Sequence, residues 1–322
     1  MDRERNVNLK RRWLRAFVTI GVLLALVFAF LRVREFREDG HSDLRCYDYW
    51  ATRKLVRLTA RAARLLEEKG EEALADFSAD PDQWSVNGES YLYVYDREGV
   101  NLFHGGYPEL QGQQLGDLHD LLGKDIHRLV LDQLDNHSES NPHGWCHYLW
   151  AAPGSLQGAW KSSCHFPATL PDGRRVYVGS GHNTPLIERE FFRITVDQAA
   201  ELLAGKGEAA LTELKDPEGP FIIYDESVFV LDPAGKAIID PALDLKKPRD
   251  LFTYRDLSGH FPLRELAERL DQEETAWVVT LSRERAGGHP AKKGIYGRKA
   301  QLDGEPVIVG ALCELPEPAW MR

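Results

Sequence analysis

The sequence predicts an α+β protein built from two similar modules that follow a short N-terminal segment. Two observations lead to this prediction. The chain has 322 residues, which suffices for two domains that each bury a core of their own. Short motifs also recur in one order along the chain, at offsets between 131 residues (Leu170 to Gln301) and 137 residues (Lys69 to Lys206). Recurrence at a nearly constant offset indicates duplication of one structural unit.

The duplication rests on matches that are weak one by one and strong as an ordered set. The matched features are KGEEAL (Lys69–Leu74) with KGEAAL (Lys206–Leu211), YVYDREG (Tyr93–Gly99) with FVLDPAG (Phe229–Gly235), DLHDLLG (Asp117–Gly123) with FTYRDLSG (Phe252–Gly259), Trp145 with Trp277, Lys161 with Lys293, and LPDGRRVYVGSG (Leu170–Gly181) with QLDGEPVIVGAL (Gln301–Leu312). We therefore expect one module at 44–190 and a second at 191–318.

Each copy has the same predicted order of elements: a helix, a hairpin, a short helix and three further strands. Apolar residues at helical spacing mark the helices, and alternating aromatic and β-branched residues mark the strands. The main predicted elements are helices 44–77 and 194–214, strands 91–96 and 227–232, strands 100–104 and 237–240, and short helices 124–134 and 261–270. Such an order is typical of an antiparallel sheet with helices at one face or end.

The N-terminal segment differs from the rest in composition. Residues 1–15 are rich in Arg and Lys, and residues 16–31 carry no charge. This pattern predicts a transmembrane anchor at 16–33, with 1–15 as a cytoplasmic basic segment. The soluble part is then expected in the periplasm, anchored to the inner (cytoplasmic) membrane by a single pass. The alternative is a signal peptide that is cleaved after Ala29.

Composition and motifs exclude several classes of function. The net charge of −10 argues against a nucleic-acid partner, because phosphate binding needs a basic surface. No GxSxG, HExxH, phosphate-binding or dinucleotide-binding motif occurs, so we expect neither an enzyme nor a cofactor. Eight of the 11 histidines lie between His104 and His182, and among them only His143 and His147 are four residues apart, in a predicted loop-to-strand segment where they need not face each other. We interpret them mainly as scattered surface residues and expect no metal site.

The four cysteines suggest two disulfides, because an oxidising compartment permits them. Cys146 and Cys164 lie on two neighbouring predicted strands, in a register that places residue 147 opposite Cys164. Cys46 and Cys313 lie near the two ends of the soluble part. The alternative is that these residues are buried thiols.

Lys161 is the sharpest candidate for a binding residue. It lies in a predicted strand beside an aromatic-rich strand, without an adjacent acidic residue, and its ammonium could meet a carboxylate ligand. Tyr148 and Trp150 share one face of their strand, and Tyr93 lies on an aromatic face of another, so these rings could wall a pocket. The alternatives are a solvated edge-strand lysine and tyrosines that pack in a core.

Five motifs of the first copy resemble the double-Cache family of extracytoplasmic sensors. They are YLYVYDREGVNLFH (91–104), ELQG (109–112), DLHDLLGK (117–124), GWCHYLW (144–150) and KSSC (161–164). The second copy is similar more loosely, since Asp240 replaces the histidine and Thr280 stands where Tyr148 does. The resemblance implies a PAS-like fold for each copy and binding of small molecules, commonly carboxylates or amino acids, rather than catalysis. It also implies pocket roles for Lys161 and His104, and Lys293 is the matching residue of the second copy.

These observations lead to a functional hypothesis. We expect an extracytoplasmic module that senses a small carboxylate or amino acid, with the first copy as the better binding module. No second apolar segment or output domain follows in the sequence, so we expect signalling through a separate membrane partner such as a histidine kinase or cyclase. The alternative is a structural or assembly protein of the cell envelope that has a Cache fold and no ligand.

Overall fold

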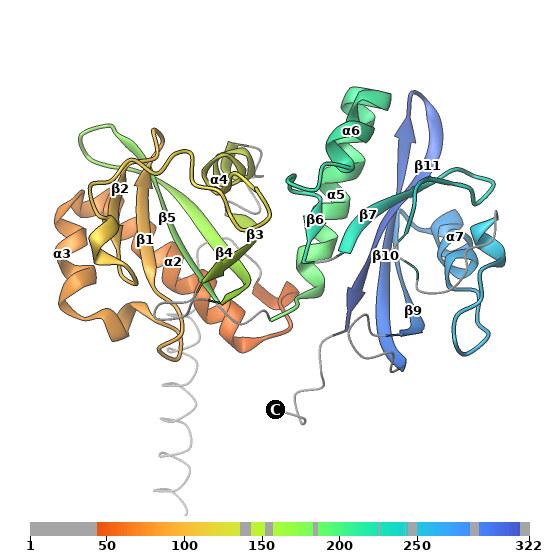
Figure 1. The fold of residues 1–322 in the computed structure, drawn as a ribbon, viewed down its shortest axis with the longest axis horizontal. Coiled ribbons are helices and arrows are strands. Elements are labelled where there is room, and N and C mark those ends of the chain that lie inside the picture. Colours follow the sequence, from red (N-terminus) through yellow and green to blue (C-terminus); the bar gives the residue numbers. More distant parts are fainter. Residues whose placement is uncertain are drawn as a thin grey trace, which may run out of the picture. The chain divides into compact units, whose positions relative to one another are not determined.

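The computed structural model describes residues 44–135, 143–151, 157–182, 186–224, 226–241, 243, 250–283 and 290–315. Two antiparallel sheets with flanking helices make up this part of the chain (Figure 1). We call residues 44–182 the first module and residues 186–315 the second module.

The first module contains a five-stranded sheet in the order β2-β1-β5-β4-β3. Because β1, β5 and β4 are inner strands, their backbone groups are paired on both sides, and β2 and β3 form the edges. The elements of the module are η1 (Leu44–Cys46), α2 (Trp50–Lys69), α3 (Glu72–Ala79), η2 (Pro81–Trp84), β1 (Leu92–Asp96), β2 (Asn101–His104), η3 (Pro108–Leu110), α4 (Ile126–Asp135), β3 (Gly144–Ala151), β4 (Gly158–Thr169) and β5 (Arg175–His182).

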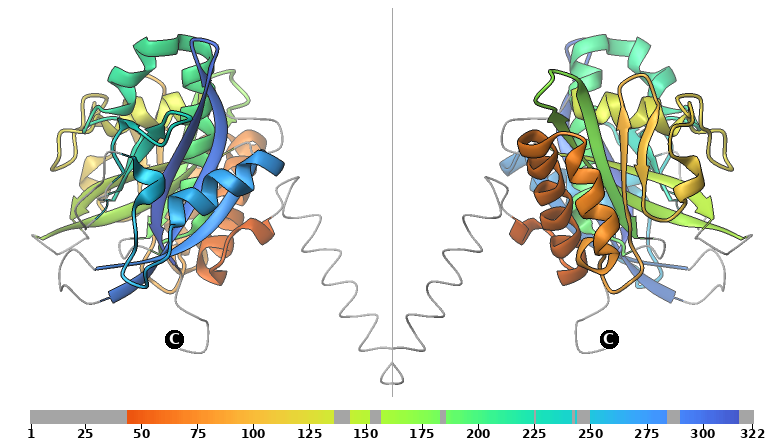
Figure 2. Two further views of the ribbon diagram at one scale, coloured as in Figure 1. Left: turned by 90° about the vertical axis from the view of Figure 1, so that its right-hand side faces the viewer. Right: turned by 90° about the vertical axis from the view of Figure 1, so that its left-hand side faces the viewer.

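Helix α2 covers one face of this sheet, where it contacts β4 and β5 (Figure 2). Its buried stripe includes Leu55, Leu58 and Leu66, which are at most 5% exposed, as the helical spacing predicts. The predicted helix over 44–77 is interrupted, however, and continues as α3. Gly70 causes the break, because its φ of +63° ends α2 in a conformation that glycine adopts at little cost.

The opposite face of the first sheet packs against α4. Leu129, Val130 and Leu134 of this helix form a cluster with ring residues of the sheet, among them Tyr93 and Tyr148. Since side chains alternate along a strand, the aliphatic residues of β1 point to α2 and its tyrosines point to α4. We call the α4 side of the sheet its aromatic face, after these tyrosines. The α2 side is aliphatic in β1, but other strands place Phe103, Trp145 and Phe166 there.

The second module contains a sheet in the order β6-β7-β11-β10-β9, and β8 pairs with β7 beside this path. Helix α5 packs against β10 and β11, and α7 packs against β9 and β10. The elements are α5 (Arg189–Lys206), η4 (Gly207–Ala209), α6 (Ala210–Leu214), β6 (Ile222–Ile223), β7 (Glu226–Leu231), β8 (Ala237–Ile239), η5 (Leu251–Thr253), α7 (Pro262–Gln272), β9 (Thr275–Arg283), β10 (Pro290–Leu302) and β11 (Glu305–Glu314).

Strand register makes the two modules comparable residue by residue. Tyr93 pairs with Gly179 where β1 meets β5, and Phe229 pairs with Gly310 where β7 meets β11. The cross-strand pair of Tyr148 and Lys161 has its counterpart in Thr280 and Lys293. The matches seen in the sequence therefore occupy matching places in the two sheets.

The fold-class prediction is right for two antiparallel α+β sheets, but the transmembrane helix that it includes has no counterpart among the described residues. Within the ranges that the structure describes, no helix is both long and apolar enough to cross a membrane. Helix α2 has 20 residues, but its sequence is not continuously apolar, because it contains charged residues such as Arg53, Lys54 and Arg57. The predicted anchor at 16–33 and the basic segment 1–15 lie outside the described residues.

Neither predicted disulfide is present, and the structure contains thiols at all four positions. In the first pair the reason is the register of β3 and β4. Cys164 lies opposite Trp145, and Cys146 lies opposite Ser163, so the two sulfur atoms point to opposite faces of the sheet. The predicted pairing of residue 147 with Cys164 is wrong, since residue 147 pairs with Ser162.

Candidate functional site

A pocket lies between the aromatic face of the first sheet, helix α4 and the segment that precedes α4. Its apolar part consists of Leu115, Leu118, Ile126 and Val130. Its aromatic and polar part comes from all five strands and α4: Tyr91, Tyr93, Tyr95, His104, His127, Tyr148, Trp150, Lys161, His165 and Tyr177. The free space in the pocket is about 30 Å³, which holds about two water molecules at ~10–15 Å³ each.

Lys161 is buried at the centre of this site, with 2% of its surface exposed. Its Nζ donates to the Tyr91 hydroxyl at 2.9 Å, and it lies 4.2 Å from the centre of the Tyr91 ring and 5.4 Å from that of Tyr93. Burial lowers the pKa of Lys161 to about 7, because an apolar environment disfavours the ammonium. The pocket-lining residues that the structure describes include no Asp or Glu.

A glycine on the neighbouring strand makes room for this lysine. Gly181 of β5 lies opposite Ser163 of β4. A Cβ atom at residue 181 would come within 2.9 Å of Lys161 Cε and 2.8 Å of Ser163 Cβ. The buried position of the lysine stem therefore depends on the missing side chain.

Polar groups continue from the lysine along the same face of β4. The Tyr93 hydroxyl lies 2.9 Å from His165 Nε2 and 3.5 Å from the Tyr148 hydroxyl. Ser163 Oγ donates to the Tyr148 hydroxyl at 3.2 Å. Burial lowers the pKa of His165 to about 3 and raises the pKa of Tyr93, so both side chains are neutral near pH 7.

His104 closes the β2 side of the pocket. Its Nδ1 accepts a hydrogen bond from the Tyr107 N–H at 3.0 Å, and its ring stacks on Tyr93 with centroids 5.7 Å apart. Burial, with the nearby Lys161, lowers the pKa of His104 to about 3. The imidazole is therefore neutral, and since Nδ1 accepts, Nε2 carries the proton.

The loop before α4 is attached to edge strand β3 on both sides of Tyr148. Asp120 accepts hydrogen bonds from the N–H groups of Leu122, Lys124 and Leu149 at 2.7–2.9 Å. Lys124, which is 1% exposed, donates to the carbonyl oxygen of His147 at 3.2 Å. Asp120 thus fixes the loop to the strand.

The matching face of the second module differs from the pocket in its chemistry. The face that corresponds to the pocket carries a hydrophobic cluster, in which Phe229 and Leu231 stand where Tyr93 and Tyr95 stand in the first module. Lys293, predicted as a binding residue, instead forms a buried ion pair with Glu226, with 2.8 Å between Nζ and Oε1.

The structure thus brings five predicted residues together in one pocket, Lys161, Tyr148, Trp150, Tyr93 and His104, and places Lys293 elsewhere. Sequence reasoning missed Tyr177 and His165. Alternation along KSSCH could have revealed His165, because residues 161, 163 and 165 share a face. The expectation of surface histidines is wrong for five residues that the structure shows to be buried: His127, His143, His147, His165 and His182.

Comparisons with known proteins give one family-model match and a number of similar solved structures. A family model described as "Cache domain" matches residues 81–167. A solved "Periplasmic sensor domain of chemotaxis protein" is 29% identical over 41% of this chain and 85% of its own, with a TM-score of 0.30. A structure reported for "carboxylic acid recognition by a Cache chemosensory domain" is 20% identical over 40% and 90% of the two chains, with a TM-score of 0.34.

A third solved structure spans more of the chain at lower identity. The periplasmic sensory domain of a Campylobacter jejuni chemoreceptor is 12% identical over 82% of this chain and 88% of its own, with a TM-score of 0.30. No curated protein matches the sequence. The Cache family model thus matches residues 81–167, which include Tyr93, His104, Tyr148 and Lys161, and this match confirms the resemblance that the sequence motifs predicted.

Proposed function

We propose that the first module senses a small monocarboxylate, which binds in the pocket around Lys161. The observation that carries this proposal is a buried lysine whose surroundings, among the described residues, contain no carboxylate. A buried charge is costly unless a partner of opposite charge accompanies it. A ligand carboxylate beside Lys161 supplies that partner.

The neighbouring groups suit a carboxylate as well. Its two oxygens accept hydrogen bonds, and Tyr91, Tyr93 and Tyr148 carry hydroxyl groups beside the lysine. Burial raises the pKa of each of these tyrosines, so their hydroxyl groups keep their protons. Charge-assisted hydrogen bonds of this kind are stronger than those between neutral groups.

The same lining favours a simple carboxylic acid over an amino acid. An α-ammonium needs an acidic partner when it is buried, and the described pocket residues offer none. Leu115, Ile126 and Val130 provide contacts for a short alkyl chain instead. Because the free space is about 30 Å³, we expect lining side chains to shift when a ligand of several heavy atoms binds.

A thermal-denaturation series with formate, acetate and propionate tests this proposal, with glycine and alanine at the same concentrations. A ligand at 100 times its dissociation constant stabilises the folded state by about 2.7 kcal/mol. We expect this stabilisation in the native protein and its loss in Lys161→Met. Lys236→Met is the matched control, since Lys236 is exposed in a turn of the second module. Absence of stabilisation by all three acids in well-folded protein would refute the proposal.

We further propose that the site lies in the periplasm and that ligand binding is reported to a separate signalling partner, such as a histidine kinase or cyclase. Its support is the match of residues 81–167 to the Cache family model, since Cache domains are sensory ligand-binding modules. The output of such a partner in cells should respond to acetate with the native chain and not with Lys161→Met. A structural role in the envelope, the alternative function, predicts that this substitution changes nothing.

A further inference from the structure

The ion pair of the second module occupies the position that matches Lys161. Lys293 pairs across the strands with Thr280, as Lys161 pairs with Tyr148. Both lysines are at most 5% exposed. They differ in their partners, because Lys161 contacts tyrosines, whereas Lys293 binds the Glu226 carboxylate at 2.8 Å.

A single replacement accounts for the different direction of the two lysine side chains. Gly181 leaves space for the Lys161 stem, and its register equivalent is Leu312, since Gly181 pairs with Ser163 and Leu312 pairs with Ile295. Leu312 is 1% exposed and belongs to the hydrophobic cluster beside α7. The Leu312 side chain lies on the face of the second sheet that corresponds to the face on which Lys161 lies in the first sheet.

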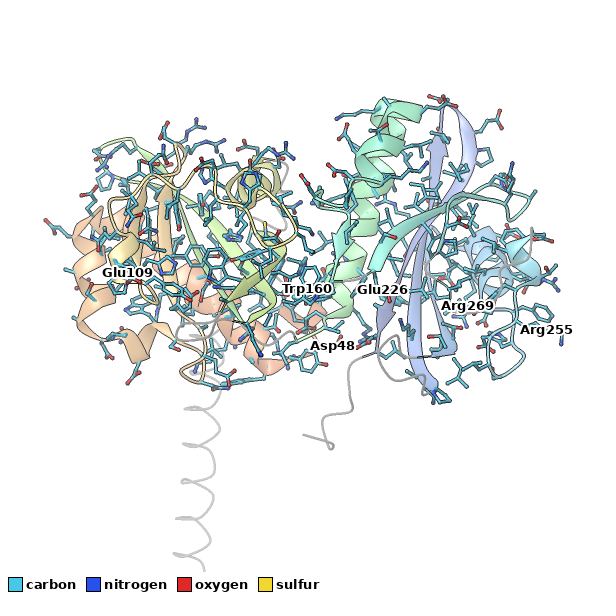
Figure 3. All side chains as sticks on the ribbon, in the orientation of Figure 1. Asp48, Glu109, Trp160, Glu226, Arg255 and Arg269 are labelled. Carbon is cyan, nitrogen blue, oxygen red and sulfur yellow. The ribbon has the colours of Figure 1, made fainter. Side chains whose placement is uncertain are left out.

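A second replacement supplies the carboxylate. Counted from the matching residues Tyr93 and Phe229, position 226 corresponds to Ser90. Ser90 Oγ accepts a hydrogen bond from the Val86 N–H at 2.8 Å and offers no charge. Glu226 begins β7 (Figure 3), and its side chain is 10% exposed, so the ion pair with Lys293 is largely shielded from water.

We propose that Lys293 is the centre of a second carboxylate-binding site, which Glu226 occupies as an internal ligand. The second module is then permanently filled, and a free carboxylate has access to Lys293 only when the Glu226 carboxylate is removed. This site is distinct from the Lys161 pocket, and the inference stands whether or not that pocket binds a ligand.

Chemical rescue tests the inference in a protein that lacks the first lysine. Glu226→Ala removes a fragment of the size of acetate, and Lys161→Met excludes binding in the first module. We expect acetate to raise the melting temperature of the Lys161→Met/Glu226→Ala protein saturably, by at least about 3 °C. Lys161→Met alone should not respond, because Glu226 still occupies the site.

A third substitution identifies the residue that responds. The protein with Lys161→Met, Glu226→Ala and Lys293→Met should show no saturable response to acetate. If the folded Lys161→Met/Glu226→Ala protein ignores acetate, or if the triple variant responds equally, the inference is wrong.

The variant without Glu226 can also fail to fold in plain buffer. If acetate, or the additional substitution Lys293→Met, then restores folding, the result supports the idea that buried Lys293 needs a carboxylate partner. Failure to fold under both conditions overturns the inference, because the carboxylate would not be acting as the ligand of this lysine.

Discussion

Lys124 Nζ donates a hydrogen bond to the carbonyl oxygen of Ile222, 2.8 Å away, and so joins the loop before α4 to β6 of the second module. The same ammonium donates to the His147 carbonyl at 3.2 Å. His147 precedes Tyr148, the cross-strand neighbour of Lys161. One buried lysine therefore contacts the strand that carries the pocket and a strand of the other module.

Substitution of Lys124 should lower the free energy of unfolding by a measurable amount. Lys124→Met retains an unbranched side chain but leaves the carbonyl groups of His147 and Ile222 without this donor. Each unpaired buried group costs about 1–3 kcal/mol, and relief of the buried charge offsets part of the loss. We expect a net loss of about 1–2 kcal/mol in the free energy of unfolding by urea. The exposed control Lys236→Met should stay within about 0.5 kcal/mol of the native protein, and equal stability of both variants would contradict this account.

Local patterns predicted the elements and much of the pocket. Alternation along a strand placed Tyr148 and Trp150 on one face, and duplication matched Lys161 with Lys293. Both features depend on residues close in sequence or on a repeat, which a single sequence displays directly.

Such local patterns cannot predict contacts between residues that lie far apart in the sequence. Glu226 and Lys293 are 67 residues apart, and Lys124 and Ile222 are 98 apart. Nothing in the sequence around Lys293 shows whether this lysine binds a ligand or forms an ion pair with an acidic residue of the protein. The buried histidines escaped prediction for the same reason, since His165 is stabilised in the core by Tyr93, a partner 72 residues away.

Removal of one hydroxyl group should affect both stability and binding. In Tyr93→Phe, His165 Nε2 loses its partner at 2.9 Å, and the ligand loses a donor beside Lys161. We expect a loss of about 1 kcal/mol in stability and a roughly tenfold weaker affinity for acetate by calorimetry. Tyr296→Phe is the matched control, because its hydroxyl donates to Asp197 at 3.2 Å in the second module. It should lower stability without changing the affinity, and a similar loss of affinity in both would argue against a ligand contact at Tyr93.

Gly181→Ala should displace the side chain of Lys161. The new Cβ would lie 2.7 Å from the Ser162 carbonyl oxygen and 2.9 Å from Lys161 Cε, so the backbone and the lysine stem must shift. Overpacking of this kind costs about 1–3 kcal/mol, and we expect acetate binding to weaken with it. Gly205→Ala in α5 is the control, since a Cβ there meets nothing within 4 Å. Native-like acetate affinity in Gly181→Ala would show that the lysine does not need this space.

The pH dependence of stability should report on Lys161. Burial lowers its pKa from 10.5 to about 7, so between these values the unfolded chain holds a proton that the folded protein has released. Stability therefore rises with pH across this window, and below pH 7 the full cost of the buried ammonium is present. His104 and His165 do not titrate in this window, because burial lowers the pKa of each to about 3.

The affinity for a carboxylate should fall as the pH rises, whereas the stability rises, because the ligand favours the ammonium form of Lys161. Binding above pH 7 then takes up a proton, and the affinity for acetate falls by up to about tenfold for each pH unit, while it changes little from pH 6 to 7. Calorimetry in buffers of different ionisation enthalpy measures this proton uptake directly. Lys161→Met should abolish the binding and reduce the rise in stability between pH 7 and 10.5. A smaller rise should remain, because burial also lowers the pKa of Lys124. An affinity for acetate that stays constant from pH 6 to 9 would show that the Lys161 ammonium is not the group that holds the ligand.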